Sequence, residues 1–68
     1  MTTVTLNGEP RELPEDATVE TAVLEVGASE RGVAVAVDGE VVPRGDWAST
    51  PVREGQEVEV LRAVQGGR

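Results

Sequence analysis

Hydrophobic and polar residues alternate in a short run at the start of the chain, residues 2–6, and an Asn7-Gly8 pair separates this run from a second extended run, residues 9–13. An Asn-Gly pair between extended runs is typical of a hairpin, because both turn residues must adopt positive φ angles. Pro10 lacks a backbone N–H donor, so the second strand is expected to lie at a sheet edge or to pair only beyond the proline. The pattern therefore predicts two antiparallel strands that end at Pro14.

A helical pattern follows the hairpin. Apolar residues recur at helical spacing at Val19, Ala22, Val23 and Val26. Thr18 is a suitable N-cap, and Asp16 and Glu20 place negative charge near the positive end of the helix dipole. Gly27 is a suitable stop. We expect a helix of about two to three turns that covers one sheet face and turns Glu20 and Glu25 towards water.

The second half of the chain predicts further strands. Residues 33–37 form a continuous run of small apolar residues, which indicates a central strand, buried by the helix on one face and lined by small residues on the other. Asp38-Gly39 predicts a second turn, and residues 40–42 predict a short strand that ends at the following proline. Residues 44–51 are expected to form a loop with Trp47 at its middle.

The last strand follows a turn at Glu54-Gly55 and alternates clearly. Val58, Val60 and Arg62 alternate with Glu57, Glu59 and Leu61. The predicted order is hairpin, helix, strand, short strand and last strand, with one main helix across a mixed sheet of four or five strands. This is the order of the α+β class known as the β-grasp or ubiquitin-like fold. We expect residues 1–64 to form that domain and residues 65–68 to form a flexible tail.

The composition limits both the core and the chemistry. A chain of 68 residues can bury one small core. Thirteen valines against a single aromatic residue, Trp47, favour strands, and we expect Trp47 to pack in the core. The chain contains no Cys, His, Lys or Tyr, so only carboxylates and hydroxyls remain as bases or nucleophiles. A domain this small can scarcely enclose a substrate, and we expect no enzymatic activity and no metal site.

The charge restricts the partners. Thirteen acidic residues against six arginines give a net charge of −7, which repels nucleic acid and anionic membranes and favours a basic protein partner. The same acidity is also explained by solubility alone. The sequence shows no signal-peptide pattern and no apolar run long enough to span a bilayer, so we expect a cytoplasmic protein.

The chain ends with Gly66-Gly67-Arg68. Glycines have no Cβ, so a Gly-Gly segment can pass through a narrow channel and bring a carboxylate to another protein's active site. A frayed end would also suit this dipeptide. Its position after a domain of the β-grasp order favours the functional interpretation.

Two segments resemble one known family. Residues 33–47, which read VAVAVDGEVVPRGDW, resemble the central block of the thiamine-biosynthesis sulfur carriers, the ThiS family, notably in Val-Pro-Arg followed by Trp. Residues 55–61 and 63–67 resemble that family's last strand and tail, and the resemblance extends from Met1 to Gly67.

This resemblance implies a reaction at Gly67. An adenylyltransferase of the E1-like family would use ATP and magnesium to adenylate the Gly67 carboxylate, and a sulfur-donor protein would then displace AMP to leave a thiocarboxylate. The carrier would deliver the sulfur to thiazole synthase and would itself bind no cofactor. Gly66 and Gln65 would lie in the partner's channel. Ala63 and Val64 are expected to contact a partner.

Several alternatives stay open at this point. Arg44 either contacts a partner or pairs with a nearby carboxylate. The same activated tail would serve a ubiquitin-like modifier or a sulfur carrier for tRNA thiolation or molybdopterin synthesis, and an interaction domain could carry an inert tail. The sequence departs from the family's Gly-Gly end at Arg68. Either a protease removes Arg68 to expose Gly67, or Arg68 is an addition to the natural chain; we expect the 68-residue form to be an inactive precursor.

Overall fold

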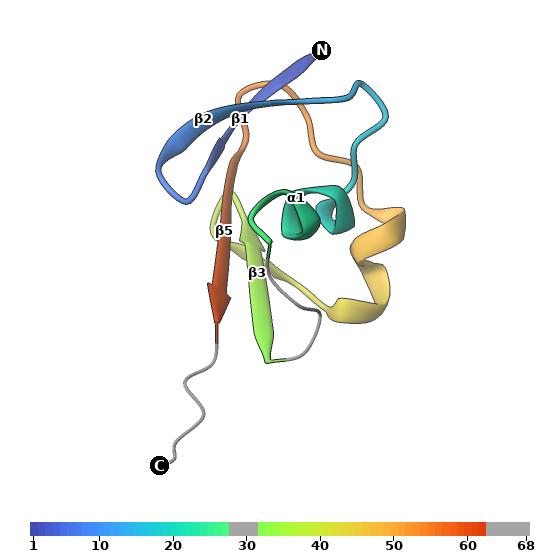
Figure 1. Ribbon diagram of the computed structural model, residues 1–68. Helices are drawn as coiled ribbons and strands as arrows, with labels where there is room; N and C mark the ends of the chain where they lie inside the picture. Colours follow the sequence, from blue (N-terminus) through green and yellow to red (C-terminus); the bar gives the residue numbers. More distant parts are fainter. Residues whose placement is uncertain (28–31, 63–68) are drawn as a thin grey trace.

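The computed structural model describes residues 1–27 and 32–62 of the chain. The elements follow one another in the order expected from the sequence, and α1 lies across one face of the sheet (Figure 1). They are β1 (Thr2–Leu6), β2 (Glu9–Leu13), α1 (Val19–Glu25), β3 (Val33–Val37), β4 (Glu40–Val42), a 3-10 helix η1 (Arg44–Ser49) and β5 (Glu57–Arg62). No helix in these two ranges is long and apolar enough to cross a membrane.

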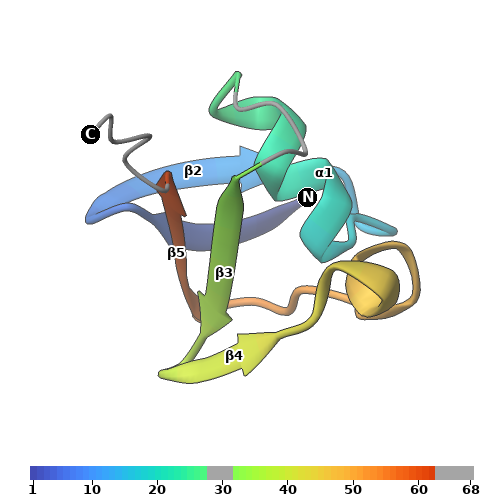
Figure 2. The ribbon, with the colours of Figure 1, turned by 90° about the horizontal axis from the view of Figure 1, so that it is seen from below.

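Within the described ranges, the strands form one five-stranded sheet in the order β2-β1-β5-β3-β4. Neighbouring strands are antiparallel except β1 and β5, which are parallel, so the sheet is mixed as expected (Figure 2). The sheet and its single covering helix confirm the β-grasp architecture. Pro10 lies in β2, which is an edge strand, so the interpretation of that proline is also confirmed.

The prediction that residues 33–37 form a central strand is confirmed, since β3 has a neighbour on each side. The strand in the middle of the sheet is β5, which the sequence did not indicate. A run of apolar residues shows that a strand is buried, whereas its place in the sheet depends on pairing with strands far away in the sequence. β3 does have the two expected faces, since Val35 and Val37 are buried and Ala34 is exposed.

Both predicted hairpin turns are confirmed by their backbone angles. Asn7 and Gly8 have φ angles of 52° and 84°, and Asp38 and Gly39 have φ angles of 51° and 84°. Positive φ at both central residues is the geometry of a type I′ turn, which matches the twist of the strands that it joins.

The ends of α1 are also as predicted. The N-cap is Thr18, whose backbone N–H donates to the Thr21 hydroxyl at 3.1 Å. At the other end Gly27 has a φ of 72° and its N–H donates to the carbonyl of Leu24 at 3.0 Å. The expectation that Glu25 faces water is confirmed, whereas Glu20 is half-buried.

Residues 44–49 form the 3-10 helix η1 where an irregular loop was expected. The Asp46 N–H donates to the Pro43 carbonyl at 2.8 Å, and the Asp46 carbonyl accepts from the Ser49 and Thr50 hydroxyls. So short a helix turns a single residue, Trp47, into the core, and one apolar residue leaves no periodic pattern to detect. The Trp47 indole N–H donates to the Val42 carbonyl at 2.9 Å.

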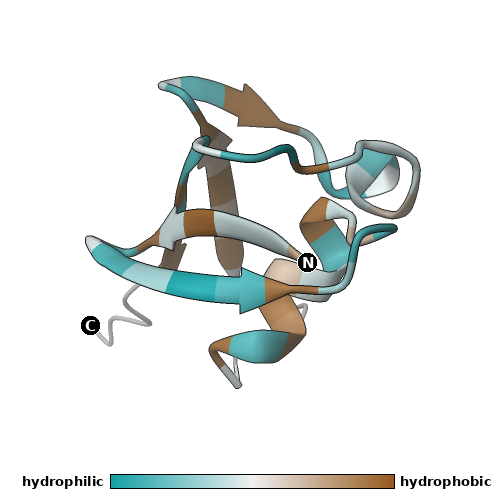
Figure 3. Ribbon diagram, turned by 90° about the horizontal axis from the view of Figure 1, so that it is seen from above, coloured by the Kyte–Doolittle hydropathy of each residue, from teal (hydrophilic) through white to brown (hydrophobic). Residues whose placement is uncertain are grey.

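The core lies between α1, η1 and one face of the sheet. Its buried side chains are apolar, and Trp47 is 3% exposed, which confirms that the single aromatic residue packs there. The buried residues are Val4, Leu6, Leu13, Ala17, Val19, Ala22, Val23, Val35, Val37, Trp47, Val52, Val58 and Val60. In the hydropathy colouring, much of β2 is hydrophilic, whereas β3 and β4 carry hydrophobic segments (Figure 3).

Val35→Asp tests the two faces of β3. Val35 is 1% exposed, so the carboxylate would be buried without a partner. We expect a loss of about 4 kcal/mol or more, comparable to the whole stability of so small a domain. Ala34→Asp, on the exposed face of the same strand, is expected to cost about 1 kcal/mol or less. Urea unfolding followed by circular dichroism would measure both; a folded Val35→Asp protein with wild-type stability would contradict the assignment.

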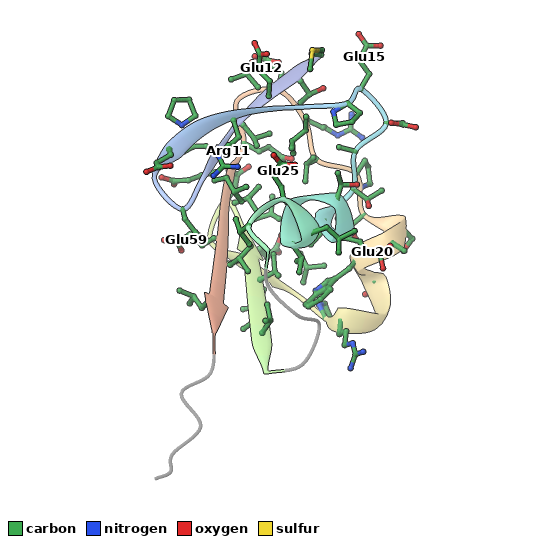
Figure 4. All side chains as sticks on the ribbon, in the orientation of Figure 1. Arg11, Glu12, Glu15, Glu20, Glu25 and Glu59 are labelled. Atoms are coloured by element: carbon green, nitrogen blue, oxygen red, sulfur yellow. The ribbon has the colours of Figure 1, made fainter. Side chains whose placement is uncertain are left out.

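Glu25→Gln tests the contribution of an exposed ion pair. A Glu25 carboxylate oxygen lies 3.4 Å from an Arg11 guanidinium nitrogen, and their side chains are 44% and 39% exposed (Figure 4). Solvent screens such a pair, so we expect the free energy of unfolding to change by less than about 0.5 kcal/mol. A loss several times larger in the same urea experiment would show that this pair fixes the position of α1 against β2.

Candidate functional site

The candidate site begins at Arg62, the last residue of β5, because residues 63–68 follow directly from that strand. The predicted activation site Gly67, the channel residues Gly66 and Gln65, and the predicted contacts Ala63 and Val64 all lie outside the described residues. The predicted boundary between domain and tail lies there too. The structure therefore describes the platform from which these residues extend.

Arg44 lies at the same end of the sheet as Arg62. β4 and β5 both run antiparallel to β3, with Val42 opposite Val35 and Arg62 opposite Val33. The end of β4, which Pro43 and Arg44 follow, is therefore level with Val60, two residues before the end of β5, with β3 between the two strands. Arg44 is exposed as the first residue of η1.

The start of β5 is held by Asp38. The Asp38 N–H donates to the Glu57 carbonyl at 2.7 Å, and one Asp38 carboxylate oxygen accepts from the Glu57 N–H at 2.9 Å. The other oxygen accepts from the Gln56 side-chain amide at 3.3 Å. The first residue of the second hairpin turn thus fixes the first residue of β5.

The end of β5 is held less evenly. β3 pairs with β5 from Glu59 to Arg62 without interruption, but β1 reaches only as far as Val58, which is opposite Leu6. Beyond Val58, the side chain of Asn7 forms the hydrogen bonds to β5 on this side. Its Oδ1 accepts from the Val60 N–H at 2.7 Å and its Nδ2 donates to the Val60 carbonyl at 3.3 Å.

An apolar patch lies on the sheet face opposite α1. Leu61 is 60% exposed and pairs with Ala34, while Val41 is 70% exposed and pairs with the half-buried Ala36. We call these four residues the outer patch. The same face of β5 carries the exposed carboxylates of Glu57 and Glu59, so Leu61 is an apolar residue in an acidic row.

Part of the outer patch is visible in the sequence pattern. The alternation in residues 57–62 places Leu61 on the polar face, where an exposed leucine has no structural reason to be. Val41 was harder to identify, since a strand of three residues shows no clear alternation. Asn7 was recognised only as a turn residue.

Within residues 1–27 and 32–62, no polar or charged side chain is buried, and no group of Asp or Glu residues is arranged to hold a metal ion. A catalytic carboxylate needs a desolvated or closely paired environment to act as an acid or base near neutral pH. No carboxylate in the described part of the chain has such a buried environment.

Comparison with known proteins identifies the family. The family model described as "ThiS family" matches residues 4–67. The sulfur carrier protein ThiS of Thermus thermophilus is 41% identical over 64 residues, which cover 94% of this chain and 98% of that protein. The chain belongs to the ThiS family. The match includes the predicted tail residues Gly66 and Gly67.

Two further comparisons extend this result for the ThiS-family chain. The crystal structure of ThiS from Geobacter metallireducens superimposes with a TM-score of 0.78 at 29% identity, covering 97% of this chain and 100% of that one. A thiazole synthase of Paramagnetospirillum magneticum is 36% identical over 62 residues. Those residues are 91% of this chain but only 19% of that protein, so the ThiS-like segment is a small part of the synthase.

Proposed function

We propose that this ThiS-family sulfur carrier holds its sulfur as a thiocarboxylate on Gly67 and delivers it for thiazole formation in thiamine biosynthesis. The observation that carries the proposal is the family match, which covers the domain and continues through Gly67. It favours thiazole formation over the alternatives of a ubiquitin-like modifier, tRNA thiolation or molybdopterin synthesis.

The proposed chemistry takes place at the terminal carboxylate. An adenylyltransferase of the E1-like family joins the Gly67 carboxylate to the α-phosphate of ATP, with magnesium bound to the nucleotide, and pyrophosphate leaves. Sulfur from a donor protein, at the oxidation level of sulfide, attacks the acyl carbon, and the carbon–oxygen bond to AMP breaks. Because the chain has no cysteine, it cannot hold sulfur as a persulfide, and the activated carbonyl is the position left for it.

The side chains of this protein indicate that catalysis is supplied by its partner. The chain contains no His, Cys, Lys or Tyr, and the carboxylates of its described part are exposed or half-buried on the surface. The adenylyltransferase therefore binds ATP and magnesium and supplies the catalytic groups. We expect this reaction to take place in the cytoplasm. The carrier contributes a rigid domain and a narrow tail, in which Gln65 and Gly66 occupy the partner's channel.

The thiazole synthase comparison supports the proposed acceptor. A segment similar to this chain occurs inside the synthase of Paramagnetospirillum magneticum. Joining two proteins that act together in one chain raises their effective concentration, so a carrier segment within a synthase is expected if the carrier's sulfur is used there. We infer that the separate carrier described by this sequence serves a thiazole synthase in the same way.

The outer patch is the proposed docking surface for the adenylyltransferase. It reaches the end of β5 through Leu61, and Ala63 and Val64 follow next in the sequence. Arg44 lies on η1, which contacts α1 on the other side of the sheet, and is not part of this surface. The net charge of −7 favours a partner whose apolar contact surface has a basic rim.

Intact-mass spectrometry tests the proposed thiocarboxylate. The form ending at Gly67 is incubated with ATP, magnesium, sulfide and a ThiS-family adenylyltransferase, and we expect the mass gain of one oxygen replaced by sulfur. The 68-residue form should gain it far more slowly, because the arginine side chain is long and permanently charged.

A form ending at Gln65 is the control. It should gain no mass yet keep its thermal unfolding midpoint, because the buried core residues that the structure describes run from Val4 to Val60. A mass gain in this truncated form would place the modification elsewhere and overturn the proposal.

Leu61→Gln tests the docking surface. Removing this apolar contact from the centre of an interface should raise the dissociation constant for the adenylyltransferase about tenfold, measured by calorimetry. Leu24→Gln is the matched control, because Leu24 is 64% exposed but lies on α1, across the core from the outer patch. Equal affinities for the two variants would contradict docking on this face.

A further inference from the structure

The side chain of Asn7 acts as an extra strand residue beside the end of β5. The Asn7 N–H donates to the Val58 carbonyl at 2.9 Å, which is the last backbone hydrogen bond from this hairpin to β5. Its side-chain amide then accepts from the Val60 N–H and donates to the Val60 carbonyl. One amide group thereby satisfies both backbone groups of Val60 on the side that β1 no longer covers.

Turn geometry alone does not require an asparagine at this position. Asp38 is the first residue of the other hairpin turn and has nearly the same φ, 51° against 52° for Asn7. Asp38 also binds β5, but through acceptor oxygens that receive an N–H from Glu57 and one from Gln56. An ionised aspartate has no donor for a carbonyl, whereas the amide of Asn7 supplies one donor and one acceptor.

The contact between Asn7 and Val60 lies close to the point where the tail begins. Val60 is 6% exposed, so its backbone groups would lie beside the core without a partner if the amide were absent. Val60 is also two residues before the end of β5 at Arg62, and the tail begins directly afterwards. Asp38, in contrast, binds Glu57 at the other end of the same strand.

We propose that Asn7 is a positioning residue for the tail. It keeps the last residues of β5 in the sheet, so the chain leaves the domain in one fixed direction relative to the outer patch. A partner that binds the patch and the tail together then orders fewer backbone residues on binding. This inference rests on the proposed function, because it concerns the delivery of Gly67 to the adenylyltransferase.

The test compares two glycine substitutions. Asn7→Gly and Asp38→Gly both suit a positive φ, both keep the backbone hydrogen bond of the turn residue to β5, and both remove two side-chain hydrogen bonds. With the carrier as the varied substrate for adenylation, Asn7→Gly should raise KM about tenfold, equivalent to about 1.4 kcal/mol. Its kcat should not change, because the bound tail is the same. Asp38→Gly should change neither constant.

Hydrogen exchange supplies a second readout that does not depend on the partner. In Asn7→Gly the amide of Leu61, which pairs with Ala34 and loses no partner directly, should lose protection, while Val58 stays protected. Asp38→Gly should leave Leu61 protected. Should Asn7→Gly fail to fold, Asn7→Asp keeps the turn and the acceptor but lacks the donor, and it should also raise KM.

The outcomes separate this inference from the proposed function. If the wild-type form ending at Gly67 is not adenylated, the proposed function fails. If it is adenylated, but Asn7→Gly matches the wild type in KM, or both glycine variants raise KM equally, Asn7 contributes only to turn stability and the positioning role is wrong. A fall in kcat with KM unchanged would also contradict it.

Discussion

The pairing of β5 between β1 and β3 is the interaction on which the rest of the structure depends. It joins the two ends of the chain, since β1 begins at Thr2 and β5 ends at Arg62, and it carries Val58 and Val60 into the core. Closing so long a loop costs entropy, and without a disulfide that cost is offset by aliphatic packing. The strand in the middle of the sheet is therefore also the one that the proposed reactive end of the chain follows in sequence.

Local features of the fold could be predicted because single residues determine them. Asn7-Gly8 and Asp38-Gly39 take positive φ angles that few residue pairs tolerate, and Thr18 and Gly27 mark the ends of α1. The position of β5 in the middle of the sheet could not be predicted, because pairing between distant strands leaves no local pattern. The 3-10 helix was missed because Trp47 is its only buried residue.

The candidate site also has a part that the sequence predicts and a part that it does not. Gly67 was predicted from the family resemblance together with the position of Gly-Gly after a β-grasp domain, and it stays a prediction because it lies outside the described residues. The surface at the end of β5 could not be predicted from the sequence. The pairing register places Leu61 beside Ala34, and the Asn7 amide binds Val60, a residue far away in the sequence. In the proposed function, this domain, which has no buried polar side chain among its described residues, serves chemistry by holding and presenting a tail.

Transfer of labelled sulfur tests the central claim most directly. The form ending at Gly67 would be converted to its thiocarboxylate with a heavy sulfur isotope, freed of excess sulfide, and mixed with a thiazole synthase and its other substrates. The account predicts that the label appears in the thiazole while the carrier returns to its original mass. Label that stays on the carrier while thiazole forms from another sulfur source would contradict the account.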